Sequence, residues 1–174
     1  MATVEIRPLR RQDDRSGFAS GQPALDRFFK HYAGQNQFKY GIGTTCVAVV
    51  SETIAAFATV TAGAIERQTL PDARLRKRLP AYPLPVLRLA RLAVDQRAQG
   101  AGFGKAMLRH VLQLAVAQRQ SLGCVGVVTD AKADAVSFYE AMGFIPLEGV
   151  DEGALLGDPT PMFLEMGTIL EAMK

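Results

Sequence analysis

Residues 92–105 read LAVDQRAQGAGFGK. The first three are apolar and predict the end of a buried strand, and the three glycines at alternate positions predict a turn. A helix is expected to begin directly after the last glycine, at Lys105. Backbone N–H groups at a helix start lack intrahelical partners, and the helix dipole favours negative charge there. The stretch therefore predicts an anion-binding loop between a strand and a helix.

Two familiar phosphate-binding patterns do not fit this loop. A Walker A loop ends in Gly-Lys-Ser/Thr, whereas Lys105 is followed here by Ala106. A dinucleotide fingerprint needs the spacing GxGxxG and opens a βαβ unit, and neither condition is met. A tight turn that requires glycine only for positive φ remains an alternative explanation.

Outward from this loop, apolar patterning predicts regular elements along the whole chain. Strands are expected at 4–9, 44–50, 53–62, 86–94, 124–129 and 162–167, and helices at 23–38, 105–120 and 133–142. Residues 66–85 contain four prolines and are expected to be irregular, which is typical of functional or mobile segments. The order predicts a single mixed α/β domain covering residues 1–174.

Charge is distributed unevenly along the chain. Residues 1–65 carry a net charge of +2, residues 66–119 a net +8 and residues 120–174 a net −7. A basic middle indicates a polyanionic ligand, because local potential steers binding. A solvated surface whose charges cluster only in sequence explains the same pattern.

Composition narrows the class of protein. Apolar residues make up 48% and charged residues 21% of the 174 residues, which is typical of a globular domain. No apolar run approaches the roughly 18 residues that a membrane span needs, and no secretory signal is visible. Cys46 and Cys124 lie in apolar runs and are expected to be buried thiols of a reducing compartment. A cytoplasmic protein with no metal site is expected.

Two motifs, in this order, resemble the GNAT acetyltransferases. Arg97-x-x-Gly100-x-Gly102 resembles the Arg/Gln-x-x-Gly-x-Gly/Ala pyrophosphate loop of that family, and residues 137–144, SFYEAMGF, resemble its Phe-Tyr-x-x-x-Gly-Phe pattern. The resemblance implies the α/β (α+β) GNAT fold. That fold has a mixed, mostly antiparallel central sheet, splayed fourth and fifth strands, and helices on both faces.

The same resemblance implies acetyl-CoA as cosubstrate and transfer of its acetyl group to an amine. Backbone amides of the fourth strand would hold the thioester carbonyl, and the glycine loop would hold the pyrophosphate. Tyr139 is the implied catalytic acid that protonates the leaving thiolate, although a tyrosine on such a helix is also compatible with core packing. The implied coenzyme-binding residues are Leu92, Ala93, Val94, Arg97, Gln99, Gly100, Ala101, Gly102, Phe103, Gly104, Lys105 and Phe138.

Residues 18–29, 33–37, 79–85 and 89–95 resemble the GNAT toxins of type II toxin–antitoxin pairs. This resemblance implies acetylation of the amino group of aminoacyl-tRNA, arrest of translation, a ribbon-helix-helix antitoxin and a homodimer. Ser20 stands where the toxins often have cysteine. Lys132 stands where many other acetyltransferases have asparagine, and this departure favours the toxin branch.

An aminoacyl acceptor reduces the need for a general base. An α-amino group titrates near 7.7–8.0, so an appreciable fraction is neutral at cellular pH. Glu66 is the one candidate base that can be placed, and His31 and His110 are expected to be ordinary surface histidines. Six basic residues are expected to contact tRNA phosphates: Arg74, Arg76, Lys77, Arg78, Arg88 and Arg91. Coenzyme phosphates or an acidic antitoxin tail are alternative ligands for them.

Two other functions are compatible with the sequence. The first is a GNAT enzyme that acetylates a small amine or a protein N-terminus. The second is a regulatory module that binds acyl-CoA without catalysis. The first predicts turnover of simple amines. The second predicts coenzyme binding that survives loss of the Tyr139 hydroxyl, with no acetyl transfer to any acceptor.

Overall fold

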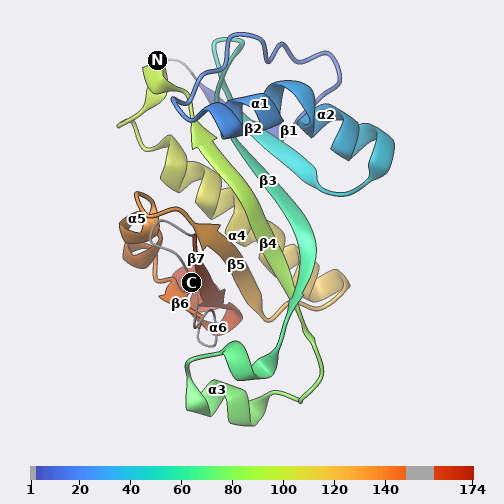
Figure 1. Ribbon diagram of the computed structural model, residues 1–174, viewed down its shortest axis with the longest axis vertical. Helices are drawn as coiled ribbons and strands as arrows, with labels where there is room; N and C mark the ends of the chain where they lie inside the picture. Colours follow the sequence, from blue (N-terminus) through green and yellow to red (C-terminus); the bar gives the residue numbers. More distant parts are fainter. Residues whose placement is uncertain (1–2, 148–158) are drawn as a thin grey trace. The chain divides into compact units, whose positions relative to one another are not determined.

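The computed structural model describes residues 3–147 and 159–174. Within these residues the strands form one seven-stranded sheet with the order β1-β2-β3-β4-β5-β7-β6 (Figure 1). The strands are β1 (Val4–Pro8), β2 (Thr44–Val50), β3 (Thr53–Ile65), β4 (Leu84–Val94), β5 (Gly126–Ala131), β6 (Ile145–Pro146) and β7 (Thr160–Glu165). The sheet is mixed and mostly antiparallel, and β4 and β5 run parallel.

The helices of the described residues range from single turns to one long helix. They are α1 (Pro23–His31), α2 (Ala33–Gln35), the π-helical η1 (Asn36–Tyr40), the 3-10 turns η2 (Arg67–Thr69) and η3 (Gln96–Ala98), α3 (Ala73–Arg78), α4 (Phe103–Ser121), α5 (Val136–Ala141) and α6 (Met166–Ala172). The chain forms two compact units. The first consists of the described residues up to Thr61 with Leu89–Gln113, and the second of Ala62–Arg88 with those of Leu114–Lys174.

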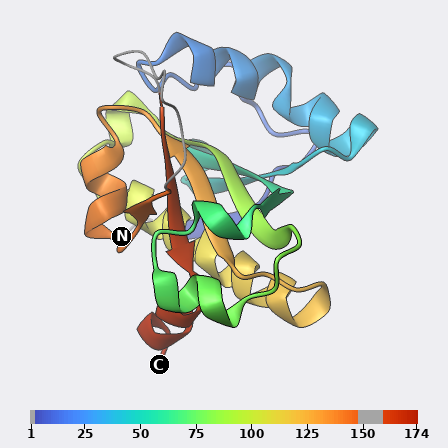
Figure 2. The ribbon, with the colours of Figure 1, turned by 60° about the horizontal axis from the view of Figure 1, so that its bottom comes forward.

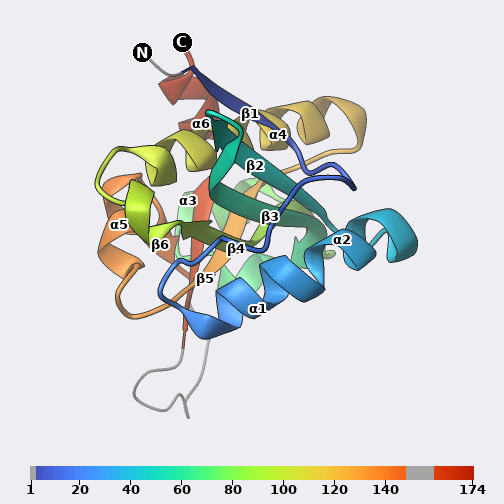
Figure 3. The same ribbon diagram turned by 90° about the horizontal axis from the view of Figure 1, so that it is seen from above.

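Aromatic packing holds the first unit together. α1, α2 and η1 follow one another along one line (Figure 3) and bury Phe28, Phe29 and Ala33. The Phe29 ring stacks on Phe57 of β3 with centroids 4.3 Å apart, and Phe18 packs edge-on against both rings. Each such ring contributes roughly 1.5–3 kcal/mol through burial. This packing fixes α1 on the sheet.

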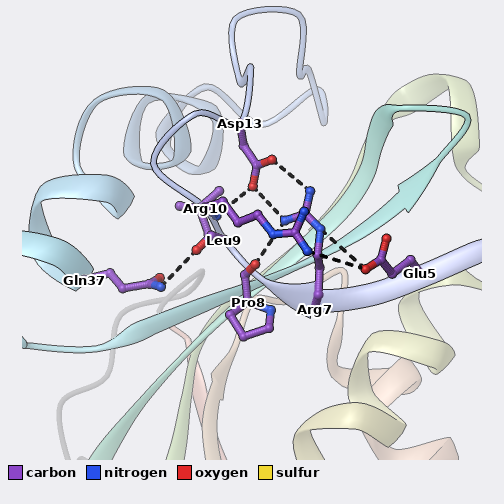
Figure 4. Close-up of polar contacts among 7 residues, drawn as sticks. All are labelled: Glu5, Arg7, Pro8, Leu9, Arg10, Asp13 and Gln37. Atoms are coloured by element: carbon purple, nitrogen blue, oxygen red, sulfur yellow. Dashed lines mark hydrogen bonds and ion pairs between the residues drawn. The ribbon is translucent and has the colours of Figure 1, made fainter.

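An ion pair in the same unit closes the loop that follows β1 (Figure 4). The Arg7 guanidinium donates to both carboxylate oxygens of Asp13 at 2.8 Å, and the Arg10 amide donates to Asp13 at 2.7 Å. These bonds hold the pKa of Asp13 below its ordinary value, chiefly through the hydrogen bond from Arg7. The pair is a local structural clamp between residues close in sequence.

The second unit has its own apolar core. Ile65, Leu70, Leu84, Val86, Val128 and Phe163 are buried together. The segment between β3 and β4, drawn in green in Figure 2, contributes Leu70 to this core and carries η2 and α3. Arg67 donates to the Leu79 carbonyl at 3.1 Å and Arg76 donates to the Leu70 carbonyl, so two arginine side chains brace this segment.

Most of the expected elements are confirmed, with ends that move by at most three residues. Residues 66–85 were expected to be irregular, which is wrong: Asp72 caps α3 by accepting from the Arg74 amide, and this short helix forms despite the prolines around it. The single helix expected at 23–38 is interrupted at Tyr32, where φ is −119°. β6 and α6 were not predicted.

Gly126 gives a test of the pairing between β5 and β7. A Cβ added there would lie 2.3 Å from the Leu164 carbonyl oxygen and 2.5 Å from the Phe163 ring. We therefore expect Gly126→Ala to lower the free energy of unfolding by about 1–3 kcal/mol, as overpacking does. Gly167→Ala in α6 is the matched control, because its Cβ would meet nothing closer than 3.8 Å. Urea unfolding measures the stability of both variants. Equal unfolding midpoints for Gly126→Ala and Gly167→Ala would contradict the pairing of β5 with β7.

Candidate functional site

The turn between β4 and α4 combines two glycines in the left-handed region with the start of a long helix. Gly100 has φ +84° and Gly102 has φ +88°, and an added Cβ at either would meet no atom within 4 Å. Glycine is therefore required by backbone conformation, and the space beside the turn is open. Ala106 makes the first helical bond, to the Gly102 carbonyl. The amides of Phe103, Gly104 and Lys105 precede it and have no intrahelical acceptor.

Asp95 anchors this turn from the end of β4. Its side chain is buried, and its carboxylate accepts from the Arg97 amide at 2.9 Å and from Arg97 Nε at 3.0 Å. The hydrogen bond from the Arg97 side chain holds the pKa of Asp95 at about 2, well below its ordinary value. The carboxylate is therefore ionised at physiological pH. Arg97, a predicted coenzyme ligand, has its guanidinium turned onto Asp95.

The Gln99 side chain connects the turn to the segment that precedes α1. Its side-chain amide donates to the Ser20 carbonyl at 3.0 Å and to the Val94 carbonyl at 3.1 Å. The motif assigned to Arg97 in the sequence also fits two residues later, at Gln99, Gly102 and Gly104. In that register Gly102 directly precedes α4, and Gly104 lies in the first turn of that helix.

The remaining predicted coenzyme residues of the first unit flank this turn. Leu92, Ala93 and Val94 are the last residues of β4. Ala101 and Phe103 line a cavity of about 340 Å³ together with Asp95, Arg97 and residues of the β2–β3 hairpin. Residues 92–105 thus form one continuous structural feature.

Tyr139 lies in α5 of the second unit and is 6% exposed. Phe138 and Phe144 pack edge-on against its ring, with centroids 5.1 and 5.3 Å away. Burial raises the pKa of the Tyr139 phenol, and a hydrogen bond with the side chain of Thr129 offsets part of that rise. The phenol therefore stays protonated at physiological pH, as a proton donor must.

The six basic residues predicted to contact tRNA differ in their surroundings. Arg74, Lys77 and Arg78 are exposed on α3, and the Arg74 side chain is 93% exposed. Arg76 is engaged with the Leu70 carbonyl, and Arg88 reaches Asp130 at 3.5 Å. The Arg91 guanidinium lies 3.7 Å from the centre of the Phe28 ring, and burial lowers its pKa. Arg74, Lys77 and Arg78 are thus the most accessible of the set.

Other titratable residues are placed as follows. Glu66 is exposed and directly follows β3, and the Thr69 hydroxyl donates to its carbonyl. His31 is exposed, whereas His110 is half-buried and has its pKa lowered by burial. Cys46 and Cys124 are buried, as expected, and burial raises the pKa of Cys46 to about 11.

Two features are absent from the described residues. In residues 3–147 and 159–174, no three or more His, Cys, Asp or Glu side chains are grouped to hold a metal ion. No helix in that part of the chain has the length and apolar character needed to cross a membrane.

Comparison with known proteins identifies the family. Residues 41–146 match the model of the acetyltransferase (GNAT) domain. The chain is also 31% identical over 157 residues to a tRNA-acetylating toxin of Mycobacterium tuberculosis (strain ATCC 25618 / H37Rv), covering 84% of this chain and 92% of the relative. The chain belongs to the GNAT acetyltransferase family.

Solved structures agree with this assignment. A tyrosine-to-phenylalanine mutant of KacT superposes on this acetyltransferase with a TM-score of 0.87 and 26% identity, covering 97% of this chain and 98% of the other. AtaTR bound with AcCoA gives a TM-score of 0.79 at 25% identity, covering 98% of each chain. The GNAT fold implied by the resemblance is confirmed.

Sequence reasoning gave no role to two residues that contact predicted site residues. Asp95 was quoted with the loop but given no role, although a carboxylate directly after a buried strand and two residues before an arginine is a usable sign of a capped turn. Thr129, which is 4% exposed in β5, is the hydrogen-bond partner of Tyr139. Its place near the end of an apolar strand gave no sign of that contact.

Because its pKa is raised, the Tyr139 phenol is expected to ionise at a higher pH than an ordinary tyrosine. The chain has four tyrosines, so subtracting the 295 nm titration of Tyr139→Phe from that of the unaltered protein isolates this phenol. We expect a midpoint above the ordinary value of about 10. Because the folded pKa is raised, this group's contribution to stability is present below pH 10 and is lost as pH rises through the folded pKa. A midpoint at or below 10 would contradict the burial of the phenol.

Proposed function

We propose that this acetyltransferase moves the acetyl group of acetyl-CoA to the α-amino group of aminoacyl-tRNA, and thereby blocks translation as the toxin of a toxin–antitoxin pair. The observation that carries the proposal is the 31% identity to a tRNA-acetylating toxin across 84% of the chain. We further propose that residues 1–174 act as one domain in a cytoplasmic homodimer, and that a ribbon-helix-helix antitoxin neutralises it.

The turn after β4 suits the pyrophosphate of the coenzyme. The first-turn amides of α4 are oriented donors at the positive end of a 19-residue helix, and the space beside Gly100 and Gly102 is open. We assign the coenzyme pyrophosphate to these amides. The amides of Leu92 to Val94 are assigned to the thioester carbonyl, where donors stabilise the negative charge that develops during transfer.

Tyr139 is assigned as the general acid. Acetyl-CoA supplies an acetyl group activated as a thioester. The phenol keeps its proton because its ring is buried, and it gives that proton to the sulfur as the thiolate leaves. The α-amino acceptor titrates near 7.7–8.0, so no dedicated base is required to make it neutral.

A labelling experiment tests this function. Labelled acetyl-CoA is incubated with the protein and total charged tRNA, the RNA is digested, and we expect label on aminoacyl-adenosine. Tyr139→Phe should lower the rate by about 10²–10⁴ while acetyl-CoA affinity is retained. Tyr40→Phe is the matched control at an exposed tyrosine and should leave the rate unchanged.

Other outcomes of that experiment point to other functions. Label transferred only to free amines or protein N-termini would show an acetyltransferase with a different acceptor. Coenzyme binding with no transfer to any acceptor would show a regulatory module. Either result overturns the proposal.

The exposed cations of α3 are assigned to tRNA phosphates. Removing two of them with Arg74→Ala/Lys77→Ala should weaken tRNA binding and reduce the slope of log K against log salt by roughly 1–2, because fewer counterions are released. Arg10→Ala/Lys174→Ala removes two exposed cations elsewhere and is the charge-matched control. Filter binding at several salt concentrations measures both. Equal slopes for the two double variants would refute the assignment.

A further inference from the structure

A second segment of the first unit is fastened to the turn after β4. The Ala19 amide donates to Asp95 Oδ2 at 3.1 Å, and the Gln96 amide donates back to the Ala19 carbonyl at 2.8 Å. The Gln99 side chain reaches the Ser20 carbonyl at 3.0 Å. These bonds join residues more than 70 positions apart in the sequence.

The same segment leads directly into α1. The Ser20 amide and hydroxyl both donate to Asp26 Oδ1, at 2.9 and 2.7 Å, which fixes Ser20 against the first turn of that helix. Gly21 has φ +92°, and a Cβ there would lie 2.6 Å from the Gln96 side chain, so the two segments lie in close contact. Figure 1 shows the start of α1 near the arrowhead of β4. The chain before α1 and the turn after β4 therefore form one hydrogen-bonded structure.

Asp95 is the centre of this structure. One carboxylate oxygen accepts from the Arg97 amide and Nε, and the other accepts from the Ala19 amide and from Arg97 Nη2 at 3.2 Å. The Asp95 side chain is 3% exposed, and charge-assisted bonds in such a site are stronger than neutral ones. The Asp95 amide also donates to the Ala55 carbonyl of β3 at 2.8 Å, and this bond fixes Asp95 to the sheet.

We propose that Asp95 is a positioning residue for acetyl-CoA: by fastening residues 19–20 to residues 96–99, it sets the direction in which the chain enters Gly100–Gly102 and so aligns the first-turn amides of α4 for the coenzyme. Asp95 does this without touching the coenzyme. The proposal rests on the assignment of those amides under Proposed function. It makes coenzyme affinity depend on a segment, Ala19–Asp26, that carries no predicted coenzyme ligand.

Asp95→Asn tests the proposal, because it keeps the size of the side chain but removes one acceptor oxygen and the charge. We expect the Kd for acetyl-CoA, measured by calorimetry, to rise about tenfold or more, and the KM to rise with it. The kcat at saturating acetyl-CoA should change little, because the catalytic acid is unaltered. Ser20→Ala, a milder break in the same structure, should raise the Kd in the same direction by a smaller factor.

Asp13→Asn is the matched control. Asp13 also forms a two-pronged pair with an arginine in the first unit, with 11% of its side chain exposed (Figure 4). It should lower thermal stability and leave the Kd for acetyl-CoA unchanged. A general loss of stability would instead raise the Kd in both aspartate variants, and that result would overturn the proposal.

Hydrogen exchange measures an effect that a purely structural role of Asp95 would not produce. Acetyl-CoA should slow exchange at the Ala19 and Gln96 amides of the unaltered protein and have less effect on them in Asp95→Asn. A folded Asp95→Asn that binds acetyl-CoA as tightly as the unaltered protein would overturn this proposal alone. Failure of the unaltered protein to bind acetyl-CoA would overturn the proposed function, and this proposal with it.

Discussion

Between Val94 and Phe103 a strand ends, the chain adopts positive φ twice, and a 19-residue helix begins. One buried carboxylate, that of Asp95, organises this stretch: its four hydrogen bonds hold Arg97, which precedes the glycines, and Ala19 of a distant segment. The proposed coenzyme site depends on the result, since donors stabilise an anion only when their directions are fixed beforehand.

Charge and proton donation are placed in different chemical surroundings. Among the cations predicted to contact tRNA, the most accessible lie on the short helix α3, where they suit contacts with phosphates that give affinity and little sequence discrimination. The Tyr139 phenol lies among aromatic rings, where an ionised form would be poorly solvated. Such burial favours the neutral acid that the proposed chemistry requires.

The sequence was informative where a local pattern has a single physical explanation. Glycines at 100 and 102 preceded a helix with an apolar stripe, and both the turn and the helix are present because only glycine adopts positive φ there without strain. β6 was missed because a two-residue strand has no periodicity to detect. α3 was missed because four prolines in residues 66–85 outweighed the cap that Asp72 provides.

The contacts that shape the site could not be predicted from one sequence, because they join distant positions. Ala19 meets Asp95, and Thr129 meets Tyr139, only after the sheet has formed. The surroundings of Arg91 were equally hidden: the sequence shows only its place in a basic run, and the structure places its guanidinium over the Phe28 ring. A charged residue's neighbours, and not its presence in a basic run, decide what it can bind.

The most direct measurement of the central claim is a crystal structure of this protein with acetyl-CoA, examined at the pyrophosphate. The account predicts pyrophosphate oxygens at hydrogen-bond distance, about 3 Å, from amides between Gly100 and Lys105, with the bonds of Asp95 intact. A pyrophosphate bound elsewhere, with those amides facing solvent, would contradict it.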